Sequence, residues 1–443
     1  MAFPFEALMS RRCRLKRVVP FRQGTFSFVE RSRRRERWFK LAIVATTLVV
    51  VAALIAAAPR GRYLVVSLAD RSRRLAWQAV GVPPDRSEID AEWARYRQQG
   101  IVDSLREFPK VFAEIDPPLQ RLMKYAGNDP ETGILRWGNF SQTLLLPSTV
   151  FLPDDTGRSY RLRPNTRSVW LRNLTIQRIP LTFFLVPDGP DLGEAMRGTA
   201  AVRVEGSVQT TNSWGLRGPE PDPSAPLRGI VLGDSFMQGL FIGDDQTPPE
   251  SLRRYLQKQL KTRVSVLNTG HLGYSPEQEY YTLLEYAERF HPRFVVLSLF
   301  ANDFGGVFEV AAGKGGDWPE GKYWLGQITQ YCRGRGIVAL TIPAPLESQI
   351  NARRFAGNYP GKVSNILESA GIEFLDPIES FVNEHLARVL EGTRAGNRPT
   401  TSPLFNGVIA DGHFSAIGSE LWAAEVGQRL ALLLEKAQPD KPS

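Results

Sequence analysis

One short stretch in the middle of the chain limits its possible folds more than any other. Residues 229–239 contain an apolar run, 229–232, that stops at Gly233 and is followed at once by Asp234 and Ser235. Such a run is typical of a buried parallel strand that ends in a tight turn. Ligands of open α/β sheets bind where the strands end, and the following helix points its free N–H groups there. Ser235 is therefore well placed to attack a carbonyl, although Asp and Ser also commonly cap helices.

Two later segments repeat the pattern of a strand followed by polar residues or glycine: residues 264–275 lead into a glycine loop, and residues 294–303 end in Asn-Asp. Near the C-terminus, residues 411–418 read Asp-Gly-His-Phe-Ser-Ala-Ile-Gly. Further strands are predicted at 337–342 and 373–375, and helices around 250–261, 276–290, 323–335, 348–370 and 417–437. Strands that alternate with helices of this length predict an α/β fold, with a parallel sheet covered by helices on both faces.

Serine, glycine, asparagine and histidine, each at a strand end or loop and in this order, resemble the four blocks of the SGNH (GDSL-like) hydrolase superfamily. The likeness covers about residues 210–436 and takes in the approach segment 211–218, Thr-Asn-Ser-Trp-Gly-Leu-Arg-Gly. Four ordered blocks are far more specific than one motif. The resemblance implies an α/β/α sandwich whose five parallel strands have the flavodoxin-like order 2-1-3-4-5.

The resemblance also implies an acyl-enzyme mechanism. Ser235 would be the nucleophile, His413 the base that takes its proton, and Asp411 the carboxylate that orients His413. Asp411 stands two residues before the histidine, whereas three is the commonest spacing in the superfamily. The alternative is an Asx turn at Asp411, with Ser235 and His413 working as a dyad.

An acyl transfer site also needs donors for the negative oxygen of its tetrahedral intermediate. The resemblance offers the backbone N–H of Ser235, the backbone N–H of Gly273 and the side-chain amide of Asn302. Gly273 is preferred to Gly270, which would only permit the turn. This chemistry requires neither a metal nor a cofactor.

Three aromatic or imidazole side chains are candidates for contact with substrate. The segment 305–324, directly after Asn302, is rich in glycine and aromatic residues and includes Trp318 and Trp324. A loop there would overhang the site and could stack a sugar ring or cover an acyl chain. The alternative is that its aromatic side chains pack back on the domain. His271 lies in the glycine loop, where it could touch substrate.

The N-terminal part predicts a membrane anchor. Leu41–Ala58 contains no charge, and with Trp38 and Phe39 as interfacial residues it reads as a transmembrane helix over 39–58. The basic tail, 1–38, would lie in the cytoplasm and the rest of the chain outside it, anchored in the inner membrane of a bacterium. A signal peptide cleaved after Ala58 is the alternative.

Charge and cysteine content argue against a nucleic-acid-binding protein, a disulfide-stabilised protein and a cysteine-bound metal site. Residues 1–40 hold twelve Lys or Arg and three Glu, so they account for the whole net charge of +9. No basic face for nucleic acid is therefore implied in the folded part. Two cysteines on opposite sides of the apolar segment indicate neither a disulfide framework nor a cysteine metal site.

The remaining segments divide by composition. Residues 59–130 are charged and helical in pattern, which predicts a stalk. Residues 131–218 contain short β-type runs at 143–146, 168–171, 181–186 and 200–208, which predict a small β-rich module. Residues 219–443 would form the hydrolase domain.

The expected function is an extracytoplasmic serine ester hydrolase acting on a small acyl ester, such as the O-acetyl groups of an envelope glycan. An O-acyltransferase with the same site is the first alternative, since a sugar hydroxyl would only replace water. A non-catalytic envelope scaffold or glycan-binding protein is the second.

Overall fold

The computed structural model describes residues 116–127, 135–137, 144–154, 156–172, 183–300, 303, 319–347, 350, 363–364, 367–368, 371–394, 402–406 and 412–437. The chain divides into two compact units, Met1–Val80 and Gly81–Ser443, and all of these residues belong to the second. The predicted transmembrane helix and most of the predicted stalk lie outside the described residues. Within the described part of the chain, no helix has the length and apolar character needed to cross a membrane.

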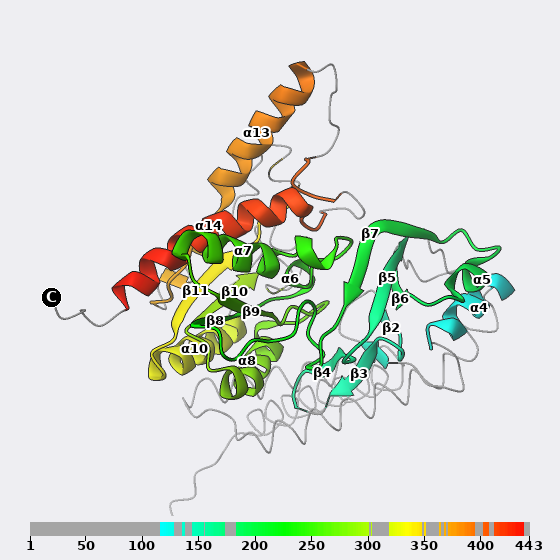
Figure 1. Cartoon of the computed structure of the whole chain (residues 1–443), viewed down its shortest axis with the longest axis horizontal. Coiled ribbons are helices and arrows are strands. Elements are labelled where there is room, and N and C mark those ends of the chain that lie inside the picture. The colour runs from blue at the N-terminus through cyan, green and yellow to red at the C-terminus, as the bar shows by residue number, and fades with distance from the viewer. Residues whose placement is uncertain are drawn as a thin grey trace, which may run out of the picture. The chain divides into compact units, whose positions relative to one another are not determined.

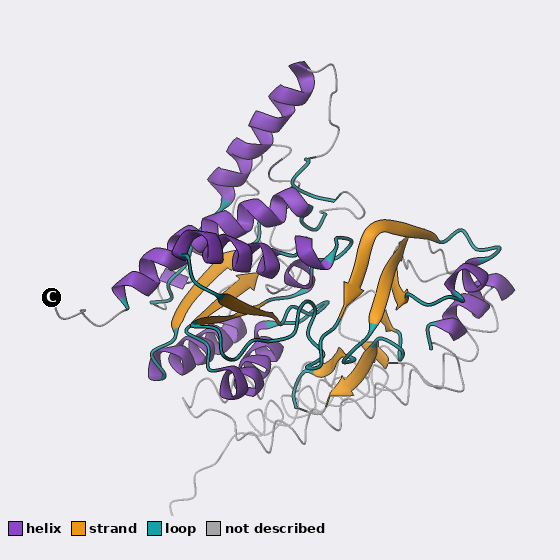
Figure 2. Cartoon of the chain, in the orientation of Figure 1, coloured by secondary structure: helices purple, strands orange, loops and turns teal. Residues whose placement is uncertain are grey.

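Four parallel strands form the central sheet (Figures 1 and 2). They are β8 (Leu227–Leu232), β9 (Val264–Asn268), β10 (Phe294–Leu299) and β11 (Val338–Pro343), in the spatial order β11-β10-β8-β9. All six residues of β10 are buried, as expected for a parallel strand covered on both faces. The strand that leads to Ser235 is therefore interior, with β10 on one side and β9 on the other.

Helices cover both faces of this sheet. Figure 1 shows α7 (Pro248–Leu260) and α14 (Ala416–Lys436) on one face, and α8 (Pro276–Phe290) and α10 (Pro319–Gly334) on the other. Local signals set three of the helix starts. Thr247 and Ser415 cap α7 and α14 by accepting backbone N–H bonds, and Ser275 forms a capping box with Gln278 at α8. The predicted α/β sandwich is confirmed.

The predicted five-stranded sheet needs a correction. Four strands form the sheet among the described residues, and the fifth position holds only a parallel bridge between Thr341 and Phe374. Thr341 exchanges backbone hydrogen bonds with Glu373 and Leu375, each 2.9 Å long. The chain then turns through Asp376 into α13 (Ile378–Arg394), so the segment is too short for a ladder. The strand order otherwise agrees with 2-1-3-4-5.

The β-rich region is built from antiparallel pairs. Its main sheet has the order β6-β5-β7, from β5 (Arg167–Arg172), β6 (Phe183–Pro187) and β7 (Val202–Thr210). Two further pairs join β1 (Leu135–Trp137) to β2 (Leu144–Leu146) and β3 (Phe151–Asp154) to β4 (Ser159–Leu162). The β3–β4 pair was not predicted. The helices α4 (Pro117–Tyr125) and α5 (Leu192–Met196) pack with β5 and β6 in a small apolar core.

A separate apolar cluster joins the β-rich region to the segments around Ser235. It combines Trp170 of β5 and Tyr160 of β4 with Phe241, Leu272 and Tyr274. The Trp170 and Phe241 rings lie 5.2 Å apart in edge contact. The two parts of the folded unit therefore share a core beside the predicted site.

Candidate active site

The turn that carries Ser235 combines the two roles that the sequence left open. After β8 the chain passes through Gly233 and Asp234 into a single helical turn, α6 (Ser235–Gln238). Asp234 caps this turn, since its Oδ1 accepts the Phe236 N–H at 2.9 Å. Ser235, the first residue of the turn, is free of that task. Its Oγ instead lies 2.7 Å from Nε2 of His413.

Arg217, in the segment that approaches β8, holds the other end of this turn. Its side chain is fully buried, and it donates to the carbonyls of Gln238 at 2.7 Å, of Gly239, and of Ile242 at 2.6 Å. Asp244 accepts from its Nε at 2.8 Å and balances its charge. These carbonyls belong to the last residue of α6, Gln238, and to the residues that follow it, where intrahelical donors run out. Arg217 thus fixes the chain directly behind Ser235.

His413 lies just before α14, in an apolar setting. Its ring centre is 4.6 Å from that of Phe236 and 6.2 Å from that of Phe241, and the residue is 7% exposed. Burial lowers the pKa of His413 to about 3. The imidazole is therefore neutral at physiological pH, and Nε2 can accept the hydroxyl proton of Ser235.

Asp411 lies outside the described residues. When Nε2 of His413 accepts from Ser235, the ring proton is on Nδ1, and that buried atom has no hydrogen-bond partner within the described ranges. A buried donor without an acceptor is costly. That Asp411 accepts a hydrogen bond from Nδ1 of His413 stays a prediction.

Glu347 was missed by sequence reasoning, because it belongs to no recognised block. It follows β11 by four residues, is 7% exposed, and accepts the Gly412 N–H at 3.1 Å through Oε2. Asn406 donates its backbone N–H to the carbonyl of His413 at 2.9 Å. The backbone on both sides of the imidazole is thereby held. A carboxylate at the carboxyl end of a strand was the signal that could have found it.

The two glycines of the loop after β9 have different tasks. Gly270 donates its N–H to Asn268 Oδ1 at 3.1 Å, and a Cβ there would lie 2.3 Å from the backbone nitrogen of Gln238. Gly270 thus permits close approach to the Ser235 turn. Gly273 has φ +71° and donates its N–H to no other atom of the described residues. The backbone N–H of Gly273 therefore remains available to a substrate oxygen.

Asn302 and Trp318 lie outside the described residues, whereas His271 and Trp324 are buried within them. The Nδ1 of His271 donates to the Thr269 carbonyl at 2.9 Å, and its Nε2 accepts from the Leu162 N–H at 3.4 Å. Burial lowers the pKa of His271 to about 4. Trp324 packs on Tyr280 and Tyr281. These contacts favour structural roles, and substrate binding by either residue stays a prediction.

Two carboxyl groups that the sequence did not assign to the site, Glu279 and Asp303, lie near Asp234, the cap of the Ser235 turn. Glu279 of α8 is 1% exposed, and neither of its oxygens has a hydrogen-bond partner within the described residues. Burial and the nearby carboxylates of Asp303 and Asp234 raise the pKa of Glu279 well above its ordinary value. Burial and Asp234 do the same for Asp303. The described residues contain no cluster of three or more acidic, His or Cys side chains suited to a metal ion.

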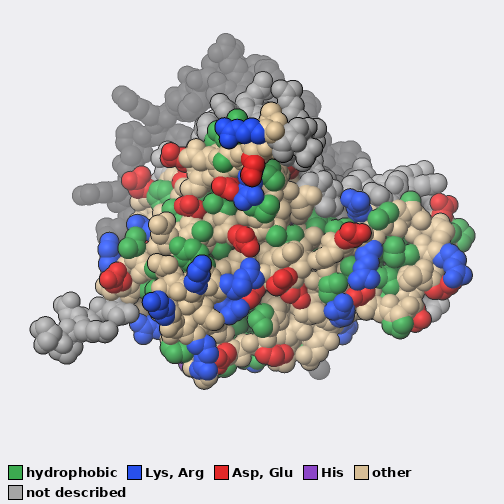
Figure 3. All heavy atoms as spheres, turned by 45° about the horizontal axis from the view of Figure 1, so that its top comes forward, with side chains coloured by type: hydrophobic (Ala, Val, Ile, Leu, Met, Phe, Trp, Pro, Cys, Tyr) green, Lys and Arg blue, Asp and Glu red, His purple; other side chains and the backbone are tan. Residues whose placement is uncertain are grey.

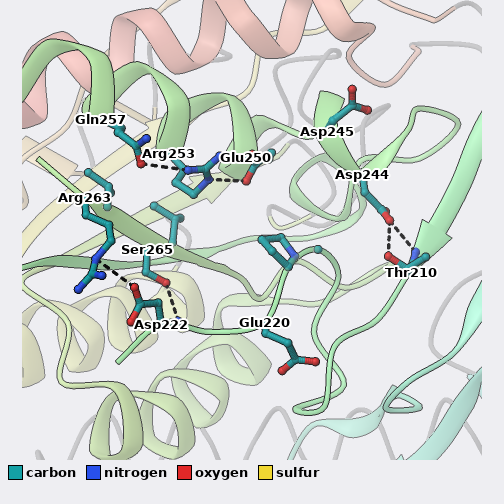
Figure 4. Close-up of a pocket in the computed structure, with 14 residues that line it drawn as sticks. Thr210, Glu220, Asp222, Asp244, Asp245, Glu250, Arg253, Gln257, Arg263 and Ser265 are labelled. Carbon is teal, nitrogen blue, oxygen red and sulfur yellow. Dashed lines mark hydrogen bonds and ion pairs between the residues drawn. The ribbon is translucent and has the colours of Figure 1, made fainter. Parts of the chain in front are cut away.

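An open hollow of about 500 Å³ lies along β9 and α7 (Figure 4). Two of its arginines are turned toward carboxylates: Arg253 toward Glu250 at 2.7 Å and Arg263 toward Asp222 at 3.3 Å. Neither Ser235 nor His413 lines it. On the face shown in Figure 3, acidic and basic side chains are interspersed.

No protein-family model matches the chain, and no curated protein matches it. Several solved structures resemble it. An acetyl xylan esterase, AlAXEase, is 18% identical over 46% of this chain and all of its own, with a TM-score of 0.34. A lipase/acylhydrolase from Enterococcus faecalis is 14% identical over 49% of this chain and all of its own, with a TM-score of 0.32.

A two-domain esterase, CEX, active on acetylated mannans, is 14% identical over 49% of this chain, with a TM-score of 0.35. This chain spans 52% of that protein.

Proposed function

We propose that the chain is a serine ester hydrolase in which Ser235 is the nucleophile and His413 the general base. The observation that carries this proposal is the 2.7 Å contact between Ser235 Oγ and His413 Nε2 at the end of an interior parallel strand. A hydroxyl is a weak nucleophile unless a neighbouring base takes its proton. Burial supports this role, because it keeps the imidazole in the neutral form that accepts a proton.

The reaction proceeds in two halves. Oγ of Ser235 attacks the ester carbonyl carbon while Nε2 of His413 takes the hydroxyl proton, and the N–H groups of Ser235 and Gly273, with the amide of Asn302, bind the negative oxygen. The carbon–oxygen bond then breaks, and the alcohol leaves with the proton from His413. Water, deprotonated by the same nitrogen, then attacks the acyl carbon; the bond to Oγ breaks, Oγ takes the proton back from His413, and the carboxylic acid leaves.

The surroundings of the pair favour a small acyl group. Ser235 is 6% exposed, and the Phe236 ring lies 4.3 Å from that of Phe300 and 4.6 Å from that of His413. The O-acetyl group of an envelope glycan is an acyl group of this small kind. A sugar hydroxyl in place of water would make the same site an O-acyltransferase.

We also propose that the folded part lies outside the cytoplasm of a bacterium, anchored in the inner membrane by the helix predicted over 39–58. The support is the uncharged run Leu41–Ala58 behind a cluster of arginines. Protease added to spheroplasts should digest the folded part. Complete protection would refute this topology, and a mature N-terminus near Pro59 would show a cleaved signal instead.

Turnover of a chromogenic acetyl ester by the full chain in detergent tests the catalytic proposal. The wild type should release the chromophore and react with a fluorophosphonate at Ser235, and Ser235→Ala should do neither while keeping its melting temperature. An acetylated oligosaccharide formed when an acceptor is added would identify a transferase. A wild-type chain inert to ester and fluorophosphonate alike would favour the non-catalytic scaffold.

A further inference from the structure

The β-rich region makes direct hydrogen bonds to the loop that carries Gly273. Tyr160 of β4 donates its hydroxyl to the Leu272 carbonyl, and Tyr274 donates its own hydroxyl to the Tyr160 carbonyl. The two rings are 5.4 Å apart at 65°. A segment more than a hundred residues earlier in the chain therefore borders the loop beside Ser235.

One of these bonds falls on the peptide group that contains the proposed oxyanion donor. The carbonyl of Leu272 and the N–H of Gly273 belong to the same planar trans unit, so they point in opposite directions. A bond that holds the carbonyl also sets the direction of the N–H. Tyr160 accordingly holds one end of this peptide, while the Gly273 N–H at the other end donates to no atom of the described residues.

The preceding peptide is held from the opposite side. The Leu272 N–H donates to Oε1 of Gln238 at 2.6 Å, and Gln238 is the last residue of the turn that begins at Ser235. Nε2 of Gln238 in turn donates to Gln209 Oε1 in β7 at 3.1 Å. Leu272 is thus fixed between β4 and the Ser235 turn, which limits the movement of the following N–H relative to Ser235 Oγ.

Tyr160 is suited to act as a permanent donor. It is 2% exposed, and burial raises its pKa far above the usual range of tyrosine, so the hydroxyl keeps its proton at any working pH. A hydrogen bond to the carbonyl also polarises the amide and strengthens its N–H as a donor.

We propose that Tyr160 is a positioning residue of the oxyanion hole: its hydroxyl aims the Gly273 N–H at the oxygen of the tetrahedral intermediate. The β-rich region is then a part of the catalytic apparatus. The inference rests on the proposed hydrolase function, since it gives Gly273 a task only if Ser235 attacks an ester.

The test compares Tyr160→Phe with Tyr125→Phe in the full chain. Tyr125 provides the control, because its hydroxyl also donates to a backbone carbonyl, that of Pro187 at 2.9 Å, and accepts the Gly189 N–H at 3.1 Å, at the edge of the core of α4, α5, β5 and β6. Loss of a single oxyanion donor costs about 10²- to 10³-fold in kcat. We expect loss of its orientation to lower kcat about tenfold or more, with KM within about twofold.

Two measurements distinguish a misplaced Gly273 N–H from a general loss of stability. The rate of fluorophosphonate labelling should fall in parallel with kcat, because the adduct places an oxygen in the same hole. Tyr125→Phe should keep both rates even if its melting temperature falls as much. Gln238→Leu is the substitute test if Tyr160→Phe fails to fold. It removes the acceptor of the Leu272 N–H, and it should also slow fluorophosphonate labelling.

Tyr160→Phe with wild-type kcat and labelling rate would overturn the inference, and so would an equal loss in both Tyr→Phe variants. Gln238→Leu labelled at the wild-type rate would overturn it where Tyr160→Phe does not fold. Ser235→Ala keeps the two proposals apart. If Ser235→Ala is inactive while Tyr160→Phe is normal, the hydrolase proposal stands and this inference fails. If Ser235→Ala retains turnover, the hydrolase proposal itself fails.

Discussion

The ring of Phe236, the residue after the proposed nucleophile, lies 4.6 Å from the ring of His413 and is tilted 32° to it. This contact keeps water from one face of the base. It contributes to the burial that lowers the pKa of His413 to about 3. The ordinary pKa of an exposed histidine is about 6.5.

Activity should therefore persist at acidic pH. The base is functional when neutral, so kcat/KM for an uncharged ester should stay within about twofold between pH 8 and pH 5. A histidine of ordinary pKa would lose about 30-fold over the same range. A fall of activity with a midpoint near pH 6.5 would contradict the assignment.

The same burial has a cost in stability with a definite sign. Between pH 6.5 and about 3 the unfolded chain protonates this imidazole and the folded chain does not, so the unfolded state binds more protons. The free energy of unfolding should fall as pH is lowered through this window. His271, whose pKa is lowered to about 4, adds to the trend. Thermal melts at pH 7 and pH 5 measure it.

Arg217→Met should destabilise the protein by about 3–5 kcal/mol, because it leaves Asp244 without its buried partner and removes donors from three carbonyls behind the Ser235 turn. Urea unfolding measures the loss, and kcat should fall as the turn loosens. Arg263→Met is the control, since that side chain is 60% exposed in its pair with Asp222. Equal effects of the two substitutions would show that Arg217 has no special task.

Asp411→Asn should lower kcat by up to about 10⁴-fold if Asp411 orients the Nδ1–H of His413, because the amide can enforce the wrong tautomer. Folding should be unaffected, which a thermal melt checks. A change of less than tenfold, with His413→Ala still disabling, would establish a dyad.

Substitutions of Glu347 test whether the backbone contact at Gly412 helps to position the ring of His413. Glu347→Gln keeps an oxygen that can accept the Gly412 N–H, so it should retain most of the activity, whereas Glu347→Ala should lower kcat about tenfold. Gln and Ala variants with the same kcat would exclude this contact as a positioning device.

Glu279→Gln should stabilise the protein increasingly as pH rises. The pKa of Glu279 is raised well above 4.5 in the folded state, so above that pH the native chain binds more protons than the unfolded chain and stability falls with rising pH. The substitution removes this loss. Thermal melts at pH 5 and pH 8 give the difference, with Glu288→Gln on the same helix, 68% exposed, as control. Equal pH dependence in wild type and Glu279→Gln would mean that the group is not buried in a protonated form.

Local chemistry explains what the sequence by itself determined. The apolar runs before Ser235 and Asn302 specify buried parallel strands, and Thr247, Ser275 and Ser415 set helix starts through bonds to backbone groups at most three residues away. These signals depend on neighbouring residues only. The α/β class and the helix Pro276–Phe290 were predicted correctly for that reason.

Only the tertiary structure decided which side chains meet. Ser235 and His413 are 178 residues apart, and Tyr160 and Leu272 are 112 apart. No local pattern marks Glu347 as the acceptor of the Gly412 N–H, or Glu279 as a neighbour of Asp234. Such contacts depend on how strands and helices stack in three dimensions. The fifth strand fell short of its prediction for the same kind of reason, since the chain turns toward α13 after a single bridge between Thr341 and Phe374. Sequence thus determined the elements and the reactive residue types, whereas packing decided burial, proton affinity and the orientation of the groups around Ser235.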